Sequence, residues 1–251
     1  MKKVICCLCV FICLALAACN AAAPSGGTAG ASGSSGGNDS GGSGRPRSSD
    51  SPGEALAPLP PPERDGGMFG VDVNINQSTI DDWLERPDVT YIDMRMLYDP
   101  AGFADIGGKA NLTRTLPGFR VVPLPYIATL DAMPVSNAYD GDKLFDVVWG
   151  EGGEILSVSP NYVESELILN EIFPKDSVIF LMCGGAGYSY LTRQFLNYMG
   201  WDESMIYSTG GNWYYEGTRG IDMTIDNDDG RIATWRVNYA CIDFDNLQRI
   251  A

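Results

Sequence analysis

Cys183 stands where a strand pattern, a glycine-rich loop and a helix pattern follow one another along the chain. The apolar run VIFLM precedes it, Gly184, Gly185 and Gly187 follow it, and a helical pattern begins near Ser189. Glycine reaches backbone conformations that other residues rarely adopt, so the loop can turn several N–H groups inward as a nest for an anion. The start of a helix adds partial positive charge. These features predict a nucleophilic thiol with a lowered pKa.

The alternative for Cys183 is a purely structural role. Cysteine is commonly buried as a small hydrophobic residue, and a glycine-rich loop can join a strand to a helix without any further function. The composition limits the chemistry, because the chain contains no histidine. Ser–His–Asp and Cys–His pairs and histidine-bearing zinc sites are therefore excluded. A reaction at Cys183 would use the thiol and backbone dipoles, with no cofactor and no metal.

The N-terminal segment has the pattern of an export signal. Lys2 and Lys3 precede an apolar run that ends at Ala18, which is shorter than the ~20 residues of a membrane-spanning helix. The sequence LAAC, ending at Cys19, resembles the lipobox of bacterial lipoproteins. This resemblance implies cleavage of a signal peptide (1–18), a lipid on the Cys19 sulfur with acyl chains such as palmitate, and an extracytoplasmic location in the cell envelope. An ordinary signal peptide cut a few residues later is the alternative.

Composition divides the rest of the chain into two parts. Residues 19–67 are dominated by Gly, Ser, Ala and Pro and cannot bury enough apolar surface to fold, so we expect a flexible linker. Residues 68–251 have a globular composition and the size of one domain. The formal net charge of −15 argues against nucleic acid and against a basic patch for anionic lipid. We therefore expect contact with a membrane through the lipid anchor only.

The seven cysteines reduce to two candidate thiols in the domain. Four leave with the predicted signal peptide, and Cys19 would carry the lipid. Cys183 and Cys241 remain, which is too few for a disulfide-stapled scaffold. They could pair in an oxidising envelope, and the sequence leaves open whether their geometry allows it.

Apolar runs and helical periodicity alternate through the domain. They predict strands at residues 89–94, 119–127, 178–182 and 205–208, and helices at 79–85, 161–173 and 189–199. Two hairpins are predicted, turning at residues 150–153 and 226–230. The second turn is acidic, but Gly230 takes a ligand position of a calcium loop and no Glu closes it. The alternation predicts an α/β fold with a largely parallel sheet, and Cys183 would lie at the carboxyl edge where such sheets bind ligands.

Three further motifs accompany the cysteine loop. QSTIDDWLE predicts a capped short helix, IDMR brings Asp93 and Arg95 to the end of a strand, and MIYSTGG follows the helix after the loop. In this order and spacing, residues 75–217 resemble a rhodanese-like sulfurtransferase domain: a parallel sheet flanked by helices, here with an enlarged segment at residues 128–175 and a C-terminal hairpin.

The resemblance implies that Cys183 is the catalytic residue and that Asp93 and Arg95 support the edge of the sheet. The substrate-binding loop that it implies consists of Gly184, Gly185, Ala186, Gly187, Tyr188 and Ser189.

The chain departs from the family pattern at several positions. Family members often have Gly three residues and Arg five residues after the cysteine, where this chain has Ala186 and Tyr188. The missing basic residue argues against thiosulfate as a substrate. Arg193, one turn further along the helix, is expected to face solvent. The tryptophan expected after the glycine pair is replaced by Tyr215, with Trp213 nearby, and we expect both to pack in the core.

Two functions follow. In the first, Cys183 accepts sulfane sulfur as a persulfide and passes it to a thiol, so the partners are a sulfur donor and a thiol acceptor. In the second, the domain is a non-catalytic binding or regulatory module of the cell envelope. The presence of Cys183 favours the first, whereas a Cys183–Cys241 disulfide would switch it off.

Overall fold

A computed structural model describes residues 56–99, 111–128, 130, 139–151, 153–226 and 231–251. The predicted signal peptide, the predicted lipidation site Cys19 and most of the predicted linker lie outside the described residues. Packing begins earlier than residue 68, because Arg64 forms an antiparallel bridge with Asp72. Within the described ranges, no helix is long and apolar enough to span a bilayer.

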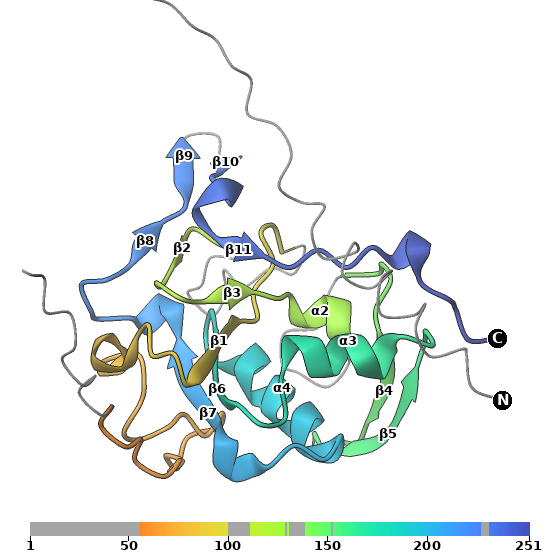
Figure 1. Cartoon of the computed structure of the whole chain (residues 1–251), viewed down its shortest axis with the longest axis horizontal. Helices are drawn as coiled ribbons and strands as arrows, with labels where there is room; N and C mark the ends of the chain where they lie inside the picture. The colour runs from red at the N-terminus through yellow and green to blue at the C-terminus, as the bar shows by residue number, and fades with distance from the viewer. Residues whose placement is uncertain (1–55, 100–110, 129, 131–138, 152, 227–230) are drawn as a thin grey trace, which may run out of the picture. The chain divides into compact units, whose positions relative to one another are not determined.

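The fold is α/β and is built on a five-stranded sheet in which every pairing is parallel (Figure 1). The strand order is β11-β3-β1-β6-β7, with β1 (Val89–Asp93) and β6 (Val178–Cys183) in the middle. β3 (Arg120–Val121) pairs with β1, β7 (Ile206–Gly211) pairs with β6, and β11 (Asn238–Tyr239) pairs with β3 at the edge. The predicted class and the largely parallel sheet are therefore confirmed.

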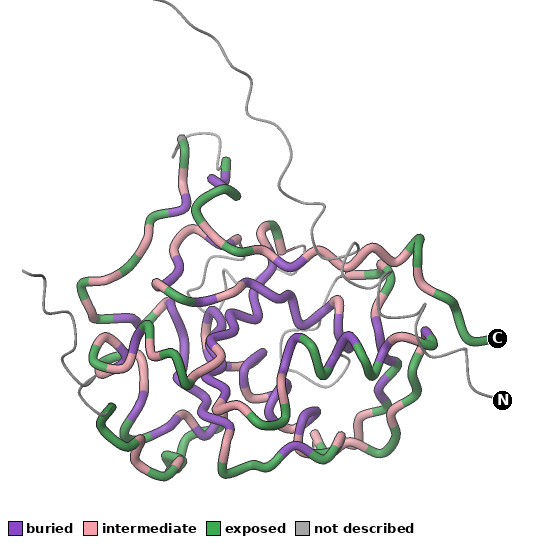
Figure 2. Tube along the Cα trace, in the orientation of Figure 1, coloured by how far each residue is buried: buried purple, intermediate pink, exposed green. Residues whose placement is uncertain are grey.

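Strand β6 is apolar throughout because both faces of the sheet are covered. Figure 2 shows the buried residues concentrated in these central strands. Side chains alternate between the two faces. Ile179 and Leu181 pack on one face in a cluster with residues of α3 (Ser165–Ile172) and α4 (Gly187–Tyr198). Phe180 points to the other face, where its ring lies 5.5 Å from that of Tyr91.

Two of the three predicted helices, and both predicted hairpins, are present with adjusted bounds. Helix α3 is shorter than residues 161–173, and α4 starts two residues before Ser189. The first hairpin pairs β4 (Phe145–Trp149) with β5 (Ile155–Pro160). The second pairs β9 (Thr224–Asp226) with β10 (Arg231–Ile232), and its turn at 227–230 lies outside the described residues.

The predicted strand at residues 119–127 is wrong over most of its length. Strand β3 has only two residues, and Leu124 begins a short helix, α2 (Leu124–Ile127). Pro123 holds the N-cap position with φ −59°, and Pro125 lies in the first turn. Proline suits these positions because its fixed φ matches a helix and its missing N–H is not needed there. The two prolines therefore start a helix rather than bend a strand.

The predicted helix at residues 79–85 is a single 3-10 turn, η1 (Ile80–Trp83). Ser78 does not cap it; its hydroxyl donates to the carboxylate of Glu216 at 2.9 Å. Glu85 has φ 61° and Pro87 follows, which ends the helical path early. Four more 3-10 turns are described: η3 (Glu203–Met205), η4 (Asn212–Tyr214), η5 (Thr234–Arg236) and η6 (Phe244–Asn246).

A pairing of two short strands that bears on the site was not predicted from the sequence. Strand β2 (Arg114–Thr115) lies antiparallel to β8 (Ile221–Asp222), which ties the chain after β1 to the chain after β7. Two-residue strands of this kind carry too little periodicity to be recognised. The pairing matters for the site because β2 supplies contacts to the side chains at the carboxyl edge of β1.

Candidate functional site at the carboxyl end of β6

Cys183 ends β6, between β1 and β7, at the carboxyl edge of the sheet. Its Cα pairs in register with that of Gly211 on β7. The residue is 2 % exposed, and its thiol is free. Cys183 is therefore not bonded to Cys241. In a parallel α/β sheet this edge, at the entry to a helix, is the usual position of a ligand site.

The prediction of a lowered pKa for the Cys183 thiol is wrong. Burial raises the pKa above the ordinary value, because a thiolate would lose its hydration, and the carboxylate of Asp93 acts in the same direction. Hydrogen bonds from the backbone N–H groups of Ser189 and Tyr188 oppose the shift without reversing it. The nest for the sulfur therefore exists, but burial outweighs it in this closed arrangement.

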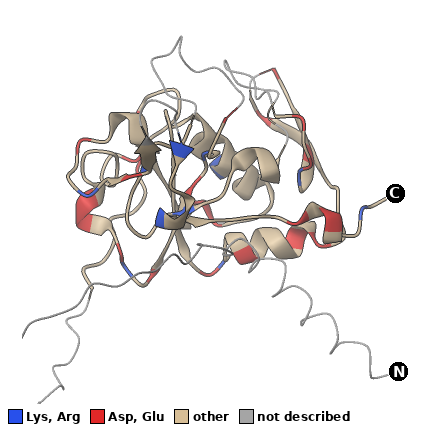
Figure 3. Cartoon of the chain, turned by 90° about the horizontal axis from the view of Figure 1, so that it is seen from above, with Lys and Arg blue, Asp and Glu red and all other residues tan. Residues whose placement is uncertain are grey.

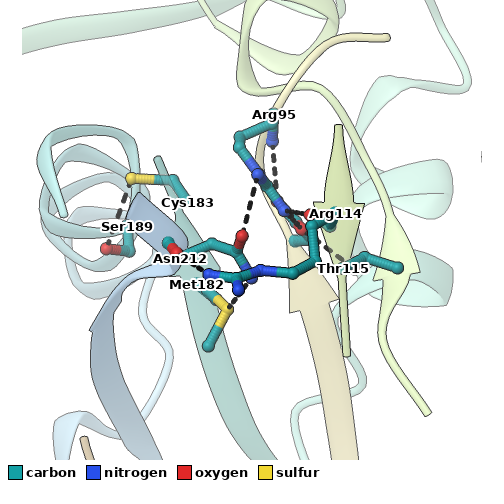
Figure 4. A network of polar contacts seen from close by, with 8 residues as sticks. Arg95, Arg114, Thr115, Met182, Cys183, Ser189 and Asn212 are labelled. Carbon is teal, nitrogen blue, oxygen red and sulfur yellow. Dashed lines mark hydrogen bonds and ion pairs between the residues drawn. The ribbon is translucent and has the colours of Figure 1, made fainter. Parts of the chain in front are cut away.

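A chain of hydroxyl groups links the sulfur to β7, and Figure 4 shows its first contact, between Cys183 and Ser189. The Cys183 Sγ lies 3.9 Å from Ser189 Oγ, which donates to the carbonyl of Ala186 at 2.9 Å. Ser208 donates to Ser189 Oγ at 3.3 Å. The Ser189 hydroxyl proton is thus already used by Ala186, so Ser189 is held in place beside the sulfur.

The glycines of the loop have a packing reason that the sequence did not reveal. A Cβ on Gly184 would lie 2.5 Å from the ring of Trp213, and a Cβ on Gly185 would lie 2.8 Å from it. The backbone N–H of Trp213 also donates to the carbonyl of Gly184 at 3.0 Å. A Cβ on Gly211 would meet that same carbonyl oxygen at 2.3 Å. The loop is therefore glycine-rich because Trp213 and β7 approach its backbone closely.

Ala186 and Tyr188 complete the loop. Ala186 has φ 72°, in the left-handed region that favours glycine, and it is the N-cap residue of α4. Tyr188 is buried, and its hydroxyl donates to the carboxylate of Asp99 at 3.1 Å. Burial also raises the pKa of Tyr188, so its phenol stays protonated and the contact persists at neutral pH. Tyr188 therefore connects the start of α4 to the chain that follows β1.

Asp93 and Arg95 form a buried ion pair at the neighbouring strand end (Figure 4). The Arg95 guanidinium donates to Asp93 through Nε at 2.9 Å and through Nη2 at 2.5 Å. Its Nη2 also donates to the carbonyl of Arg114, and Thr115 donates to Asp93 at 3.2 Å. Nη1 reaches Asn212 at 3.4 Å. The pair thus joins β1, β2 and η4, which is a supporting position beside the cysteine loop.

The expectation that Arg193 faces solvent is wrong. Its side chain is 3 % exposed, and its Nη1 donates to the carbonyl of Gly70 at 2.8 Å. Burial and the neighbouring charge of Arg64 lower its pKa to about 10. Because Gly70 belongs to the segment that precedes η1, Arg193 holds that segment against α4 rather than turning toward Cys183. Tyr215 is buried as expected, whereas Trp213 is half-buried.

Four contributors to the site carried no sequence signal: Asp99, Thr115, Ser208 and Asn212. Each forms a direct hydrogen bond with a residue of the cysteine loop or of the Asp93–Arg95 pair, and the two bonded residues are distant along the chain. The sequence contains no motif that fixes such a distance.

One hollow in the described structure lies away from Cys183. It has a volume of about 310 Å³ and is lined by Glu166, Leu169, Asn170, Lys175, Met199 and Trp201. Lys175 precedes β6 whereas Cys183 ends it, so the hollow belongs to the opposite edge of the sheet. Lys175 is already held over the Trp201 ring at 4.1 Å. Within the described ranges, no group of His, Cys, Asp and Glu side chains could hold a metal ion.

Comparisons of the chain with protein-family models, with curated proteins and with solved structures found no match. The fold and the site therefore define a class in structural terms only: an α/β protein with a free cysteine at the carboxyl end of a central parallel strand, facing the start of a helix.

Proposed function

We propose that Cys183 carries sulfane sulfur as a persulfide and that the protein is a rhodanese-like sulfur carrier. The observation that carries this proposal is the place of the Cys183 sulfur at the start of α4, 3.9 Å from Ser189 Oγ, where the backbone of Tyr188 and Ser189 acts to lower the pKa of the thiol. Preorganised backbone donors stabilise negative charge that develops on a reacting atom. A terminal persulfide sulfur carries such charge, and neither a histidine nor a metal is needed to hold it.

The reaction has two steps. The Cys183 thiolate attacks a sulfane sulfur atom of the donor, an S–S bond forms, and the donor's leaving group departs with the electron pair of the broken bond. The acceptor thiolate then attacks the outer sulfur of the persulfide, which restores the Cys183 thiolate. Because Cys183 is 2 % exposed, side chains around the loop have to move before a donor can reach the sulfur.

The same proposal covers the location of the protein. A lipid on Cys19 would anchor it in the bacterial cell envelope, with the domain outside the cytoplasm, as the LAAC sequence indicates. We expect the chain to partition into detergent when expressed in bacteria, and Cys19→Ser to abolish that partition. The formal net charge of −15 suits a domain that does not bind nucleic acid, and Figure 3 shows acidic residues on several segments of the chain.

The test of sulfur transfer is mass spectrometry of the Cys183 peptide from the full chain. The protein is treated with thiosulfate, inorganic polysulfide or dimethyl trisulfide, and Cys183→Ser is the control. A gain of sulfur from any donor that cyanide removes, absent from the control, supports a persulfide-forming site. No gain from any of the three, although Cys183 reacts with an alkylating agent after unfolding, contradicts the proposal.

A non-catalytic binding module is the second candidate, and one observation favours it. The Trp213 ring occupies the space over Gly184 and Gly185 that a substrate would use. Under this alternative the cysteine is a buried small hydrophobe. The negative outcome of the sulfur-loading experiment is the result that this candidate predicts.

A further inference from the structure

We propose that the Cys183 site selects sulfur donors with uncharged, apolar ends and excludes oxyanionic donors, and that Tyr188 and Asp99 determine this specificity. The inference rests on the proposed sulfur-carrier function and names the donor class of that same site. It depends on what surrounds the sulfur: an apolar wall, two carboxylates, and cations that are committed elsewhere.

The wall around the sulfur is apolar. Cys183 belongs to the same cluster of buried hydrophobic side chains as Leu181, Tyr188 and Leu191. Tyr188 contributes to this wall with its ring. Its hydroxyl group is already used, because it donates to the carboxylate of Asp99. Ser189 is also committed, since it donates to the carbonyl of Ala186. Among the described residues, a donor molecule entering here meets hydrocarbon and aromatic surface, the backbone N–H groups and the committed hydroxyl of Ser189.

The charges next to the loop are negative. Asp99 lies against Tyr188, and the carboxylate of Asp93 acts on the Cys183 thiol. Three arginines of the elements around the loop hold other partners: Arg95 is paired with Asp93, Arg193 donates to Gly70, and Arg114 donates to the carbonyl of Asn212. Among the described residues, a dianion placed against Cys183 would therefore lose its hydration and find no uncommitted cation in return. An uncharged donor has much less hydration to lose.

The chemistry with such a donor balances without an added oxidant. In dimethyl trisulfide the Cys183 thiolate attacks the central sulfur, and the bond between that sulfur and one outer sulfur breaks. Methanethiolate leaves with the electron pair and takes up the proton that the Cys183 thiol released. Cys183 then carries a trisulfide whose middle sulfur is the sulfane sulfur available to an acceptor thiol.

The experiment compares loading rates of dimethyl trisulfide and thiosulfate at Cys183 in the full chain. Each rate is divided by that of the urea-unfolded chain, which removes the intrinsic reactivity of the donor. We expect the folded-to-unfolded ratio to be at least about tenfold higher for dimethyl trisulfide than for thiosulfate. Asp99→Asn and Tyr188→Arg should each raise the thiosulfate ratio, with the larger rise for Tyr188→Arg, which adds a cation.

The matched control is Tyr198→Arg, which adds the same charge at an exposed position near the end of α4. It should leave both ratios unchanged. Asp99→Asn keeps a side-chain oxygen that can accept the hydrogen bond from the Tyr188 hydroxyl. This variant therefore remains informative if Tyr188→Arg fails to fold. Equal ratios for both donors, or no rise for thiosulfate in Asp99→Asn, would overturn the specificity inference while leaving persulfide formation standing. Loading by neither donor, and by inorganic polysulfide no more than by them, would instead defeat the proposed function itself.

Discussion

The sulfur of Cys183 is subject to two opposing influences at the scale of a single residue. Burial disfavours the thiolate, whereas the N–H groups of Tyr188 and Ser189 favour it, and burial is the larger effect. A thiol is neutral when protonated, so a raised pKa means that the folded chain keeps the proton at a pH where an exposed thiol has lost it. The closed site therefore protects an unreactive thiol at neutral pH.

The first prediction concerns the pH dependence of Cys183 alkylation in the folded chain. The rate should still be rising with pH at pH 9.0, the ordinary pKa of a cysteine thiol, where the rate of the unfolded chain has begun to level off, because the raised pKa of Cys183 keeps the thiolate fraction increasing there. Iodoacetamide labelling of the Cys183 peptide measures it, with the unfolded chain as the reference. A rate that levels off near neutral pH would contradict the raised pKa.

The second prediction concerns Ala186, whose φ of 72° places its Cβ in an unfavourable backbone region. Ala186→Gly should increase the free energy of unfolding by up to about 1 kcal/mol, because glycine adopts this conformation without strain. Ala128→Gly is the control, since Ala128 has φ −146° and gains nothing from glycine. Urea denaturation compares the two. A loss of stability in Ala186→Gly as large as that in Ala128→Gly would contradict the argument.

At the scale of elements, the turn between β6 and α4 is shaped by the segment that follows β7. Trp213 packs on the glycines of the loop, and Gly211 passes close to the carbonyl of Gly184. The loop and η4 therefore form one packed unit.

The third prediction is a double-mutant cycle across this contact. Gly184→Ala alone should destabilise the fold by about 1–3 kcal/mol, because its Cβ would lie 2.5 Å from the Trp213 ring. In a Trp213→Ala background the same substitution should cost much less, since the ring is gone. Chemical denaturation of the four proteins gives the coupling energy. Equal costs in both backgrounds would show that Trp213 is not the reason for the glycine.

At the scale of the whole molecule, the buried Asp93–Arg95 pair holds together segments that are far apart in sequence. It touches β1 through Asp93, β2 through Thr115 and η4 through Asn212. Strand β2 in turn pairs with β8, so the contacts run from the middle of the sheet to the C-terminal part of the domain. Removing one partner would leave the other charge buried without compensation.

The fourth prediction is that Asp93→Ala lowers the free energy of unfolding by about 3–5 kcal/mol, as expected when a buried pair loses one member. Asp88→Ala is the control, because Asp88 pairs with Arg86 at an exposed position and should cost only about 0–1 kcal/mol. Thermal and urea unfolding measure both. Equal small losses would mean that the buried pair does not brace the sheet edge.

The sequence by itself determined the α/β class, the central strands, α3 and α4, both hairpins and the position of Cys183 at a strand end. These features depend on local periodicity and on residue order, which the chain displays directly. The tertiary structure alone decided the two-residue strands, the burial of Arg193, the partners of Tyr188 and Asp93, and the direction of the Cys183 pKa shift. Each depends on segments distant in sequence coming within a few ångströms, and pattern along the chain does not encode that distance. The loop glycines illustrate the difference: their spacing predicted an open cradle, whereas the ring of Trp213 fills the space beside them.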